Sequence, residues 1–230
     1  GKTISVIGAL NVLMQDDETQ PKKVLIVCPK SVIPNWVFEL RSWLLADKEA
    51  WNLHVVTAEK GFPENPSPEA GRLEILLMNY DILDKFRCDL DNHWAPFDIL
   101  VCDEAHYLKN PSALRTKAVL GSLEQDDDKK RRKALQTQRL WLLTGSPLLN
   151  QPSELYSLLR SIDPAFRMIP ELSSFSAFGD HYSHRRDTPW GITYRGGRNL
   201  PELRERLRTE REDGTPLMIR RTKAQVLKEL

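Results

Sequence analysis

Short, continuous apolar runs recur along the first 145 residues and predict buried strands. Each run is four or five residues long and is bounded by polar or turn-forming residues. Runs of this kind, without strict alternation, are typical of parallel strands that are covered on both faces. The five runs are residues 24–28, 53–57, 75–78, 99–102 and 140–143.

Amphipathic stretches lie between these runs and predict helices. In the first of them, Ile4, Ile7, Leu10 and Met14 recur at helical spacing. Regular alternation of strands and helices predicts an α/β fold, with a doubly wound parallel sheet and helices on both faces. The other predicted helices are residues 35–45, 81–90 (with Asp81 as N-cap), 112–123 and 152–162.

The alternation ends near residue 163. Beyond it, prolines and glycines interrupt the chain, and helical patterns return only over residues 200–211 and 221–230. We therefore expect a nucleotide-binding lobe over residues 1–163 and a mostly helical C-terminal appendage over residues 164–230. No internal repeat is visible.

Composition indicates a globular protein and excludes several classes. Among 230 residues, 40% are hydrophobic and 28% are charged, and no apolar run approaches the ~20 residues of a membrane span. The cysteines (Cys28, Cys88 and Cys102) are too few for a disulfide framework. We expect a monomer in a reducing, intracellular compartment, away from membranes.

The net charge of +1 is unevenly distributed. Residues 160–230 carry 14 basic side chains, 12 of them arginine, against 10 acidic ones. Arginine favours bidentate contacts with phosphate, although a solvated surface with internal ion pairs explains this charge equally well.

The tripeptide Gly1-Lys2-Thr3 directly precedes a predicted helix and is a candidate phosphate site. It matches the end of the pattern G-x-x-x-x-G-K-[ST], in which the lysine reaches nucleotide phosphates and the hydroxyl ligates magnesium. We expect ATP and Mg²⁺ as cofactors, with the rest of the phosphate loop preceding Gly1.

Two adjacent carboxylates, Asp103 and Glu104, follow the fourth apolar run. At a strand end, Asp103 can hold magnesium and Glu104 can polarise an attacking water, as phosphoryl transfer requires. The alternative, a helix N-cap with a surface acid, does not explain the coincidence with Gly1-Lys2-Thr3. Hydroxyl residues Thr144 and Ser146 follow the fifth run and are expected to report nucleotide state together with His106.

These motifs together resemble the first RecA-like lobe of the Swi/Snf-type DNA-dependent ATPases of helicase superfamily two. The resemblance rests on GKT, LIVCP, DEAHYLKN, LTGSPLLN and IRRTK. It implies an ATP hydrolase that acts on duplex or forked DNA. In LTGSPLLN, Ser146 and Leu149 replace the family's threonine and glutamine. The implied DNA-contacting residues are Lys30, Ser31, Asn79, Tyr80, Lys109, Asn110 and Asn150.

The later part of the chain is similar to the annealing-helicase branch of that family, which remodels stalled replication forks. The similarity is carried by residues 178–182, Trp190, Gly191, Tyr194 and the segment 218–223. The resemblance implies a second RecA-like lobe that supplies arginine fingers, so the 230 residues alone should hydrolyse ATP poorly or not at all. It also implies a nuclear location in a eukaryote, or cytoplasm and nucleoid in a bacterium.

Two other functions stay open. A DEAH- or DEAD-type RNA helicase lobe would carry S-A-T where this chain has T-G-S-P. A catalytically silent module for DNA or protein docking would not need Lys2, Asp103 and Glu104. Of the aromatic residues, Trp36 and Trp43 are predicted to lie in the core.

Overall fold

The computed structural model describes most of the chain, in two compact units. Unit 1 is Gly1–Leu149 and unit 2 is Asn150–Leu230, so this division falls earlier than the predicted boundary near residue 163. No helix in the described part is long and apolar enough to cross a membrane. The described residues are 1–16, 18, 20–63, 72–122, 132–145, 152–162, 172–189, 191–208 and 218–219.

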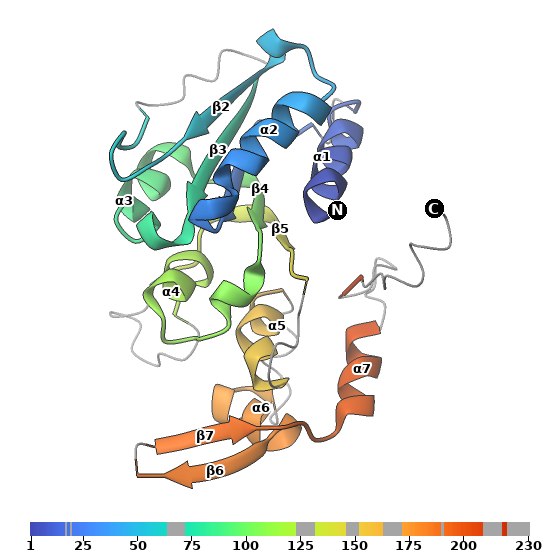
Figure 1. The fold of residues 1–230 in the computed structure, drawn as a ribbon, viewed down its shortest axis with the longest axis vertical. Helices are drawn as coiled ribbons and strands as arrows, with labels where there is room; N and C mark the ends of the chain where they lie inside the picture. Colours follow the sequence, from blue (N-terminus) through green and yellow to red (C-terminus); the bar gives the residue numbers. More distant parts are fainter. Residues whose placement is uncertain are drawn as a thin grey trace. The chain divides into compact units, whose positions relative to one another are not determined.

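Unit 1 is built on a five-stranded sheet in which every pair of neighbouring strands is parallel (Figure 1). The strand order is β2-β3-β1-β4-β5. This arrangement confirms the predicted α/β fold, and each strand overlaps one of the five apolar runs. The strands are β1 (Lys23–Cys28), β2 (Trp51–Val55), β3 (Leu73–Asn79), β4 (Phe97–Cys102) and β5 (Thr137–Leu142).

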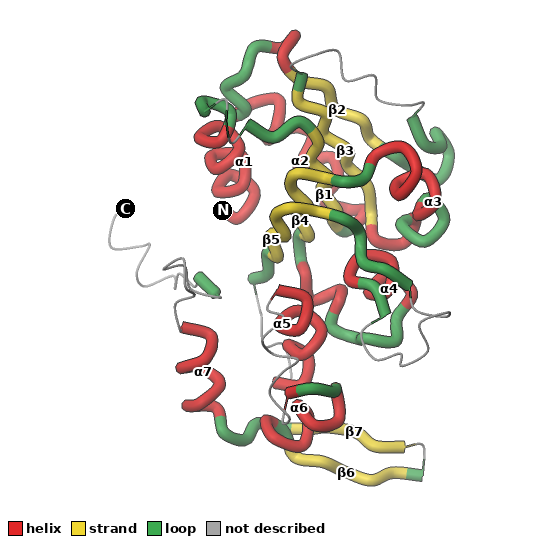
Figure 2. Tube along the Cα trace, turned by 180° about the vertical axis from the view of Figure 1, so that it is seen from behind, coloured by secondary structure: helices red, strands yellow, loops and turns green. Residues whose placement is uncertain are grey.

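One face of the sheet packs against helices α1 (Lys2–Leu13) and α2 (Ile33–Trp43), which lie together in both ribbon and tube views (Figure 2). Side chains at alternate strand positions point to the same face, so every second residue of β1, β3 and β4 joins this core. Burial of apolar surface fixes the helices here. The fully buried members include Ile7, Leu10, Trp36, Leu40, Val24, Ile26, Ile75, Leu77, Ile99 and Val101.

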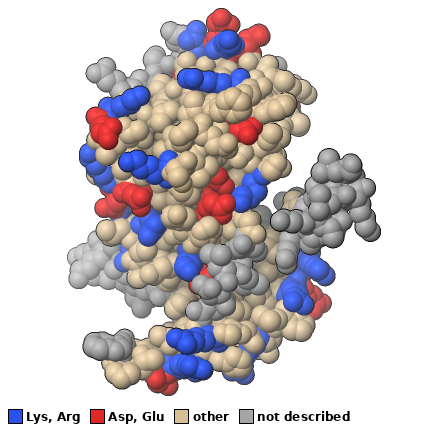
Figure 3. All heavy atoms as spheres, in the orientation of Figure 1, with Lys and Arg blue, Asp and Glu red and all other residues tan. Residues whose placement is uncertain are grey.

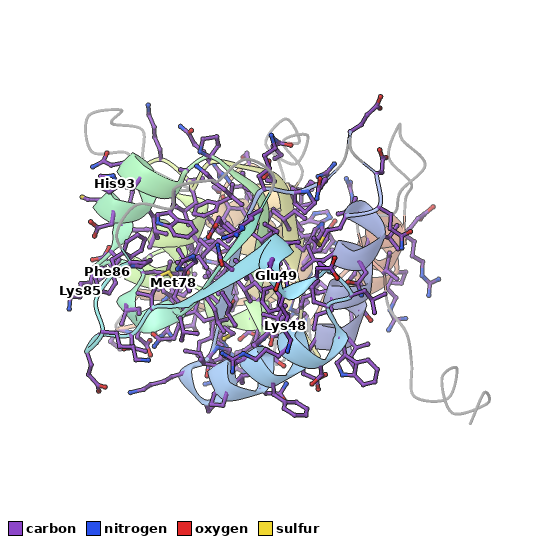
Figure 4. All side chains as sticks on the ribbon, turned by 90° about the horizontal axis from the view of Figure 1, so that it is seen from above. Lys48, Glu49, Met78, Lys85, Phe86 and His93 are labelled. Atoms are coloured by element: carbon purple, nitrogen blue, oxygen red, sulfur yellow. The ribbon has the colours of Figure 1, made fainter. Side chains whose placement is uncertain are left out.

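The other strand positions face the opposite side, which is also closed. Leu25, Leu76 and Met78 are fully buried there, and the Trp94 ring meets His54 of β2 edge-on at 5.3 Å. Figure 4 shows Met78 among the strand side chains, whereas Lys85 and His93 lie toward the periphery. The segment that covers this side comprises turns at Tyr80–Ile82 and Leu90–Trp94 and helices α3 (Arg87–Asp89) and α4 (Leu114–Leu120).

The segment after β3 differs from the predicted helix over residues 81–90. Asn79, not Asp81, caps it: the Asn79 side-chain oxygen accepts hydrogen bonds from the Asp81 and Ile82 amides at 2.9 and 3.2 Å. The backbone then forms a 3-10 turn over Tyr80–Ile82, and helix α3 followed by a π-helical turn over Leu90–Trp94, rather than one regular helix. Asparagine as the last residue of a strand satisfies these amides locally, which ends the strand without starting a regular helix.

The two tryptophans of α2 have different environments. Trp36 is fully buried, as predicted, but Trp43 is 52% exposed, so the prediction of a core position for Trp43 is wrong. Trp43 is the last residue of α2, and its carbonyl oxygen accepts a hydrogen bond from the Asn11 side chain at 2.9 Å. The helix ends before a further turn could cover its ring.

Unit 2 contains helices and one antiparallel hairpin. The helices are consistent with the predicted, mostly helical appendage. The hairpin was not predicted, and Tyr194 is the buried residue of its two strands. The hydrophobic core of unit 2 includes Phe178, Tyr182, Leu203 and Leu207. The elements are α5 (Tyr156–Ile162), α6 (Phe175–Tyr182), β6 (His184–Thr188), β7 (Gly191–Arg195) and α7 (Leu200–Arg208).

Candidate functional site

The carboxyl ends of β1, β3, β4 and β5 meet at one edge of the sheet. The register places Cys28 beside Asn79, Val27 beside Cys102, and Cys102 beside Leu142. Open α/β sheets bind ligands at this edge, where loops leave the strands. The predicted strand-end motifs are therefore brought together by the strand register.

Asp103 is the most firmly held residue at this edge. It is 4% exposed, and its amide donates to the Val27 carbonyl oxygen at 2.8 Å. Its carbonyl oxygen accepts from the Tyr80 hydroxyl at 2.7 Å, and its Oδ1 accepts from the Glu104 amide at 2.9 Å. A carboxylate held in this way keeps one orientation without needing to reorganise when it binds a ligand.

Trp36 provides the other contact to this carboxylate. Its indole Nε1–H donates to Asp103 Oδ2 at 2.9 Å, and the indole ring is fully buried on α2. Sequence analysis identified Trp36 as a core residue but missed this hydrogen bond. The available signal was a tryptophan on the buried face of α2, because a buried indole N–H usually finds an acceptor.

Glu104 has a left-handed backbone conformation, with φ 49° and ψ 52°. This region is uncommon for a residue with a Cβ atom and costs on the order of 1–3 kcal/mol, and such residues cluster at functional sites. The conformation turns the chain sharply after β4. The Glu104 carboxylate meets Lys2 Nζ at 2.7 Å through Oε1, and His106 Nδ1 lies 3.2 Å from Oε2.

The surroundings of Glu104 favour its charged form. Partial burial by itself would raise the Glu104 pKa, but the hydrogen bond and charge of Lys2, the charge of His106 and the Gly145 amide together lower that pKa below its ordinary value. Glu104 is therefore a carboxylate throughout the physiological pH range, as a residue that polarises water must be.

Gly145 lies close to the Lys2 ammonium group. A Cβ atom at position 145 would approach Lys2 Nζ to 3.2 Å, so a larger residue would require the ammonium group to shift by a few tenths of an ångström. This close approach could not be read from the sequence. Thr144 lies just before Gly145, whereas Ser146, the second of the two predicted hydroxyl residues, lies outside the described residues.

The donor set at this edge fits a nucleotide with magnesium. Lys2 offers an ammonium group for phosphate, Gly145 leaves space beside that ammonium, and Thr3 and Asp103 offer the hard oxygen atoms that Mg²⁺ prefers. Gly1 is the N-cap of α1, so the first backbone amides of this helix lie next to Lys2 and can donate to a phosphate.

The predicted DNA-contacting residues fall into two groups. Lys30 and Ser31 are exposed on the turn that follows β1. Asn79 and Tyr80 are 6% and 2% exposed and make the internal hydrogen bonds already described, which argues against direct contact with DNA. Their position instead links the end of β3 to Asp103.

Beyond His106, the exposed Tyr107 ring stacks on the buried Tyr80 ring. Tyr107 stacks on Tyr80 with ring centroids 5.4 Å apart and an interplanar angle of 10°, and the Arg115 guanidinium lies 5.4 Å from the Tyr107 centroid. Sequence analysis did not single out Tyr107 or Arg115. Nearby, the Asn110 side chain accepts hydrogen bonds from Ser112, which gives it a capping role in the turn before α4.

Two further DNA-contacting residues were predicted, Lys109 and Asn150. Lys109 is partly exposed beside Asn110, and Asn150 lies outside the described residues. Burial raises the pKa of both Cys28 and Cys102 to about 12, so these thiols are protonated core residues, in agreement with their predicted position inside strands.

Comparison with known proteins gives a family match over the whole chain. A family model described as the SNF2-related domain matches residues 1–230.

Curated relatives match over most of the chain. A SWI/SNF-related matrix-associated actin-dependent regulator of chromatin subfamily A-like protein 1 from Xenopus tropicalis is 30% identical over 208 residues, which is 90% of this chain and 18% of that protein. The DNA repair and recombination protein RAD54 of Oryza sativa subsp. japonica is 31% identical over 175 residues, 71% of this chain and 16% of that protein. The chain thus spans less than a fifth of these relatives.

A solved structure shares the fold. The Sulfolobus solfataricus SWI2/SNF2 ATPase core in complex with double-stranded DNA is 26% identical and superposes with a TM-score of 0.55, covering 79% of this chain and 32% of that one.

Proposed function

Because the chain belongs to the SNF2-related domain family, we propose that it is the ATP-binding first lobe of a DNA-dependent ATPase that translocates on duplex DNA. The observation that carries this proposal is the cluster at the carboxyl edge of the sheet. There the Lys2 ammonium, the Glu104 carboxylate and the firmly oriented Asp103 carboxylate come together from segments about 100 residues apart.

In the proposed mechanism, Lys2 binds the nucleotide phosphates and exchanges its contact with Glu104 for them. Thr3 and Asp103 would hold magnesium, with Asp103 oriented by Trp36 and by the Glu104 amide. When bound, the ion would supply a divalent charge that offsets the nucleotide phosphates. Glu104, released from Lys2, accepts a hydrogen bond from the attacking water and polarises it.

We further propose that His106, Thr144 and Ser146 couple this chemistry to the grip on DNA. His106 lies beside the Glu104 carboxylate, so a change in the ion-pair partners of Glu104 alters the electrostatic environment of the imidazole ring. The exposed residues Lys30 and Ser31, with Lys109, Asn110 and Asn150, are the proposed contacts to the DNA backbone. Asn79 and Tyr80 act from inside, as positioning residues.

The finer proposals concern the whole protein. We propose action on forked DNA, as in the annealing-helicase branch, and a second lobe that supplies arginine to the transferred phosphate. Such an arginine is worth about 10³–10⁵ in rate, so residues 1–230 alone should turn over ATP slowly. In a eukaryote the proposed location is the nucleus.

The test is ATP turnover by the full-length protein without nucleic acid and with linear duplex, forked DNA or single-stranded RNA. We expect strong stimulation by duplex DNA, a further rise with forks, and loss of all turnover in Glu104→Gln. Greater stimulation by RNA would instead identify an RNA helicase, and turnover unaffected by any nucleic acid would contradict the proposal.

A further inference from the structure

The β6–β7 hairpin of unit 2 has two chemically different faces. In an antiparallel pair, directly opposed residues share a face, and the faces alternate along each strand. Arg185 is opposite Tyr194 and Asp187 is opposite Ile192, which defines one face. We call the other face the outer face; it consists of His184, Arg186, Thr188, Gly191, Thr193 and Arg195.

The face that carries Tyr194 anchors the hairpin to α6. The Tyr194 ring is buried and lies 5.7 Å from the Phe175 ring, and its hydroxyl donates to the Ser176 carbonyl oxygen at 3.1 Å. A Cβ atom at Gly179 would come within 2.5 Å of the Tyr194 ring, so glycine is needed for this contact. The hairpin is therefore held in a defined position on α6.

Charges on this anchored face neutralise one another. The Arg185 guanidinium meets Asp187 at 3.1 Å and lies 3.8 Å from Asp180. Arg185 is thus the basic residue of the hairpin whose charge is offset within unit 2.

The outer face carries two arginine side chains without such partners. His184, Arg186 and Arg195 are all exposed, and neither arginine forms an ion pair with any residue in the described ranges. The outer face has no carboxylate and no large apolar side chain, so packing against a protein core does not account for it. Figure 3 shows basic side chains gathered over this end of unit 2.

The spacing of these groups suits a regular polyanion. Residues two apart on one strand are separated by about 6.6 Å, and opposed residues across the strands by about 5 Å. Arg186 and Arg195 can therefore reach different phosphates of one backbone, and the planar guanidinium is well matched to phosphate oxygens. The hydroxyls of Thr188 and Thr193 on the same face donate to the Gly191 and Arg186 carbonyl oxygens at 2.6 and 3.4 Å, so the two arginines are the groups that would contact phosphate.

We propose that the outer face of the β6–β7 hairpin binds the phosphate backbone of duplex DNA, as a site separate from the carboxyl edge of the sheet. The choice of DNA rests on the proposed function. The contact is electrostatic and independent of base sequence, because the phosphate groups are the same at every base pair.

The experiment measures binding of a fluorescein-labelled 30-base-pair duplex to the full-length protein by anisotropy, over a series of KCl concentrations. Removing one arginine–phosphate interaction should reduce the slope of log K against log salt by about 0.9. For Arg186→Ala with Arg195→Ala, we expect a slope smaller by about two and an affinity at 0.1 M KCl lower by about tenfold or more.

Arg185→Ala is the matched control for Arg186→Ala, because both variants remove one arginine from adjacent positions of β6 and change the net charge equally. We expect Arg185→Ala to leave the slope nearly unchanged and Arg186→Ala to reduce it by about one. Equal effects of the two variants, or an unchanged slope in the double variant, would overturn the proposal, as would tighter binding of a duplex RNA of the same length.

Wild-type ATP turnover with and without duplex DNA, measured on the same preparations, separates the two proposals. DNA-stimulated turnover with an unchanged salt slope in the double variant overturns the hairpin site alone. Failure of the wild-type protein both to bind duplex DNA and to respond to it overturns the proposed function, and the hairpin site with it.

Discussion

The carboxyl edge of the sheet in unit 1 and the outer face of the hairpin in unit 2 use charge in opposite ways. At the sheet edge, the polar groups of Asp103 and Glu104 are met by specific donors, and Asp103 is almost fully buried. On the hairpin, Arg186 and Arg195 are exposed and have no ion-pair partner among the described residues. Hydrolysis depends on exact placement, whereas attraction to a polyanion depends mainly on the sign and number of charges.

The largest effect should come from moving the Glu104 carboxylate without removing it. Glu104→Asp keeps the charge but shortens the side chain by one methylene, and misplacement by about 1 Å can cost about 10²-fold in rate. We expect a loss of that size in DNA-stimulated kcat, measured by phosphate release.

Glu49→Asp is the control, since Glu49 is exposed on the turn before β2, at the amino end of the sheet (Figure 4). Turnover of that variant should match wild type. A Glu104→Asp variant with wild-type kcat would contradict the prediction. It would show that turnover does not depend on the exact position of the Glu104 carboxylate, just as DNA binding by the hairpin is expected not to depend on the exact position of its charges.

The next largest effect is expected when the hydrogen bond from the Trp36 indole to Asp103 is removed. Trp36→Phe keeps an aromatic ring but leaves Asp103 Oδ2 without its 2.9 Å donor. A hydrogen bond to a charged group is worth about 1.5–3 kcal/mol, so we expect a similar loss in the free energy of unfolding and about a tenfold higher magnesium concentration for half-maximal turnover.

Trp94→Phe is matched to it, because Trp94 is also fully buried but its indole Nε1 has no hydrogen-bond partner among the described residues. Urea unfolding and magnesium titration of both variants make the comparison. The assignment of Trp36 as a positioning residue fails if Trp94→Phe shifts the magnesium dependence equally.

A smaller effect concerns protonation of Glu104. In Lys2→Met, partial burial is no longer opposed by the lysine, so the Glu104 pKa should rise from its lowered value. In wild type the lowered pKa contributes stability that is present above the ordinary carboxyl pKa and is lost as pH falls through the lowered one.

The stability difference between wild type and Lys2→Met should therefore be present at pH 7 and disappear in acid. Carboxyl ¹³C NMR and urea unfolding at pH 7 and pH 3 test this. Lys48→Met, on the exposed turn before β2, should leave the Glu104 titration unchanged; an equal shift in both variants would indicate a general charge effect.

The smallest effect is expected on the hairpin. Replacing Arg186 and Arg195 together by lysine keeps both charges, and DNA affinity should remain within about threefold of wild type because phosphate attraction dominates. Anisotropy at 0.1 M KCl measures this. A decrease as large as that of the double alanine variant would mean that the hairpin requires guanidinium geometry, as a bidentate site does.

The hairpin also shows why part of the fold could not be predicted. β6 reads HRRDT, without apolar alternation, and Tyr194 is the buried residue of the pair. Strands are predicted from a periodic pattern of buried apolar side chains, and in this hairpin a single buried ring, that of Tyr194, anchors both strands. The helix predicted over residues 81–90 is replaced by shorter helical pieces for a different reason, since the Asn79 side chain caps a 3-10 turn at Tyr80–Ile82 and the α-helix starts only at Arg87.

The sequence by itself determined the parallel sheet, because its central strands β1, β3 and β4 are covered on both faces and are therefore largely apolar. It also determined the placement of Lys2, Asp103 and Glu104 at strand or helix ends, because these residues belong to short motifs next to an apolar run or a predicted helix. Only the tertiary structure decided that Lys2 meets Glu104, that Trp36 orients Asp103, that Gly145 leaves space for the lysine, and that Arg185 and Arg186 lie on opposite faces. These contacts join residues far apart in the chain or depend on strand register, so they follow from packing and not from any local pattern.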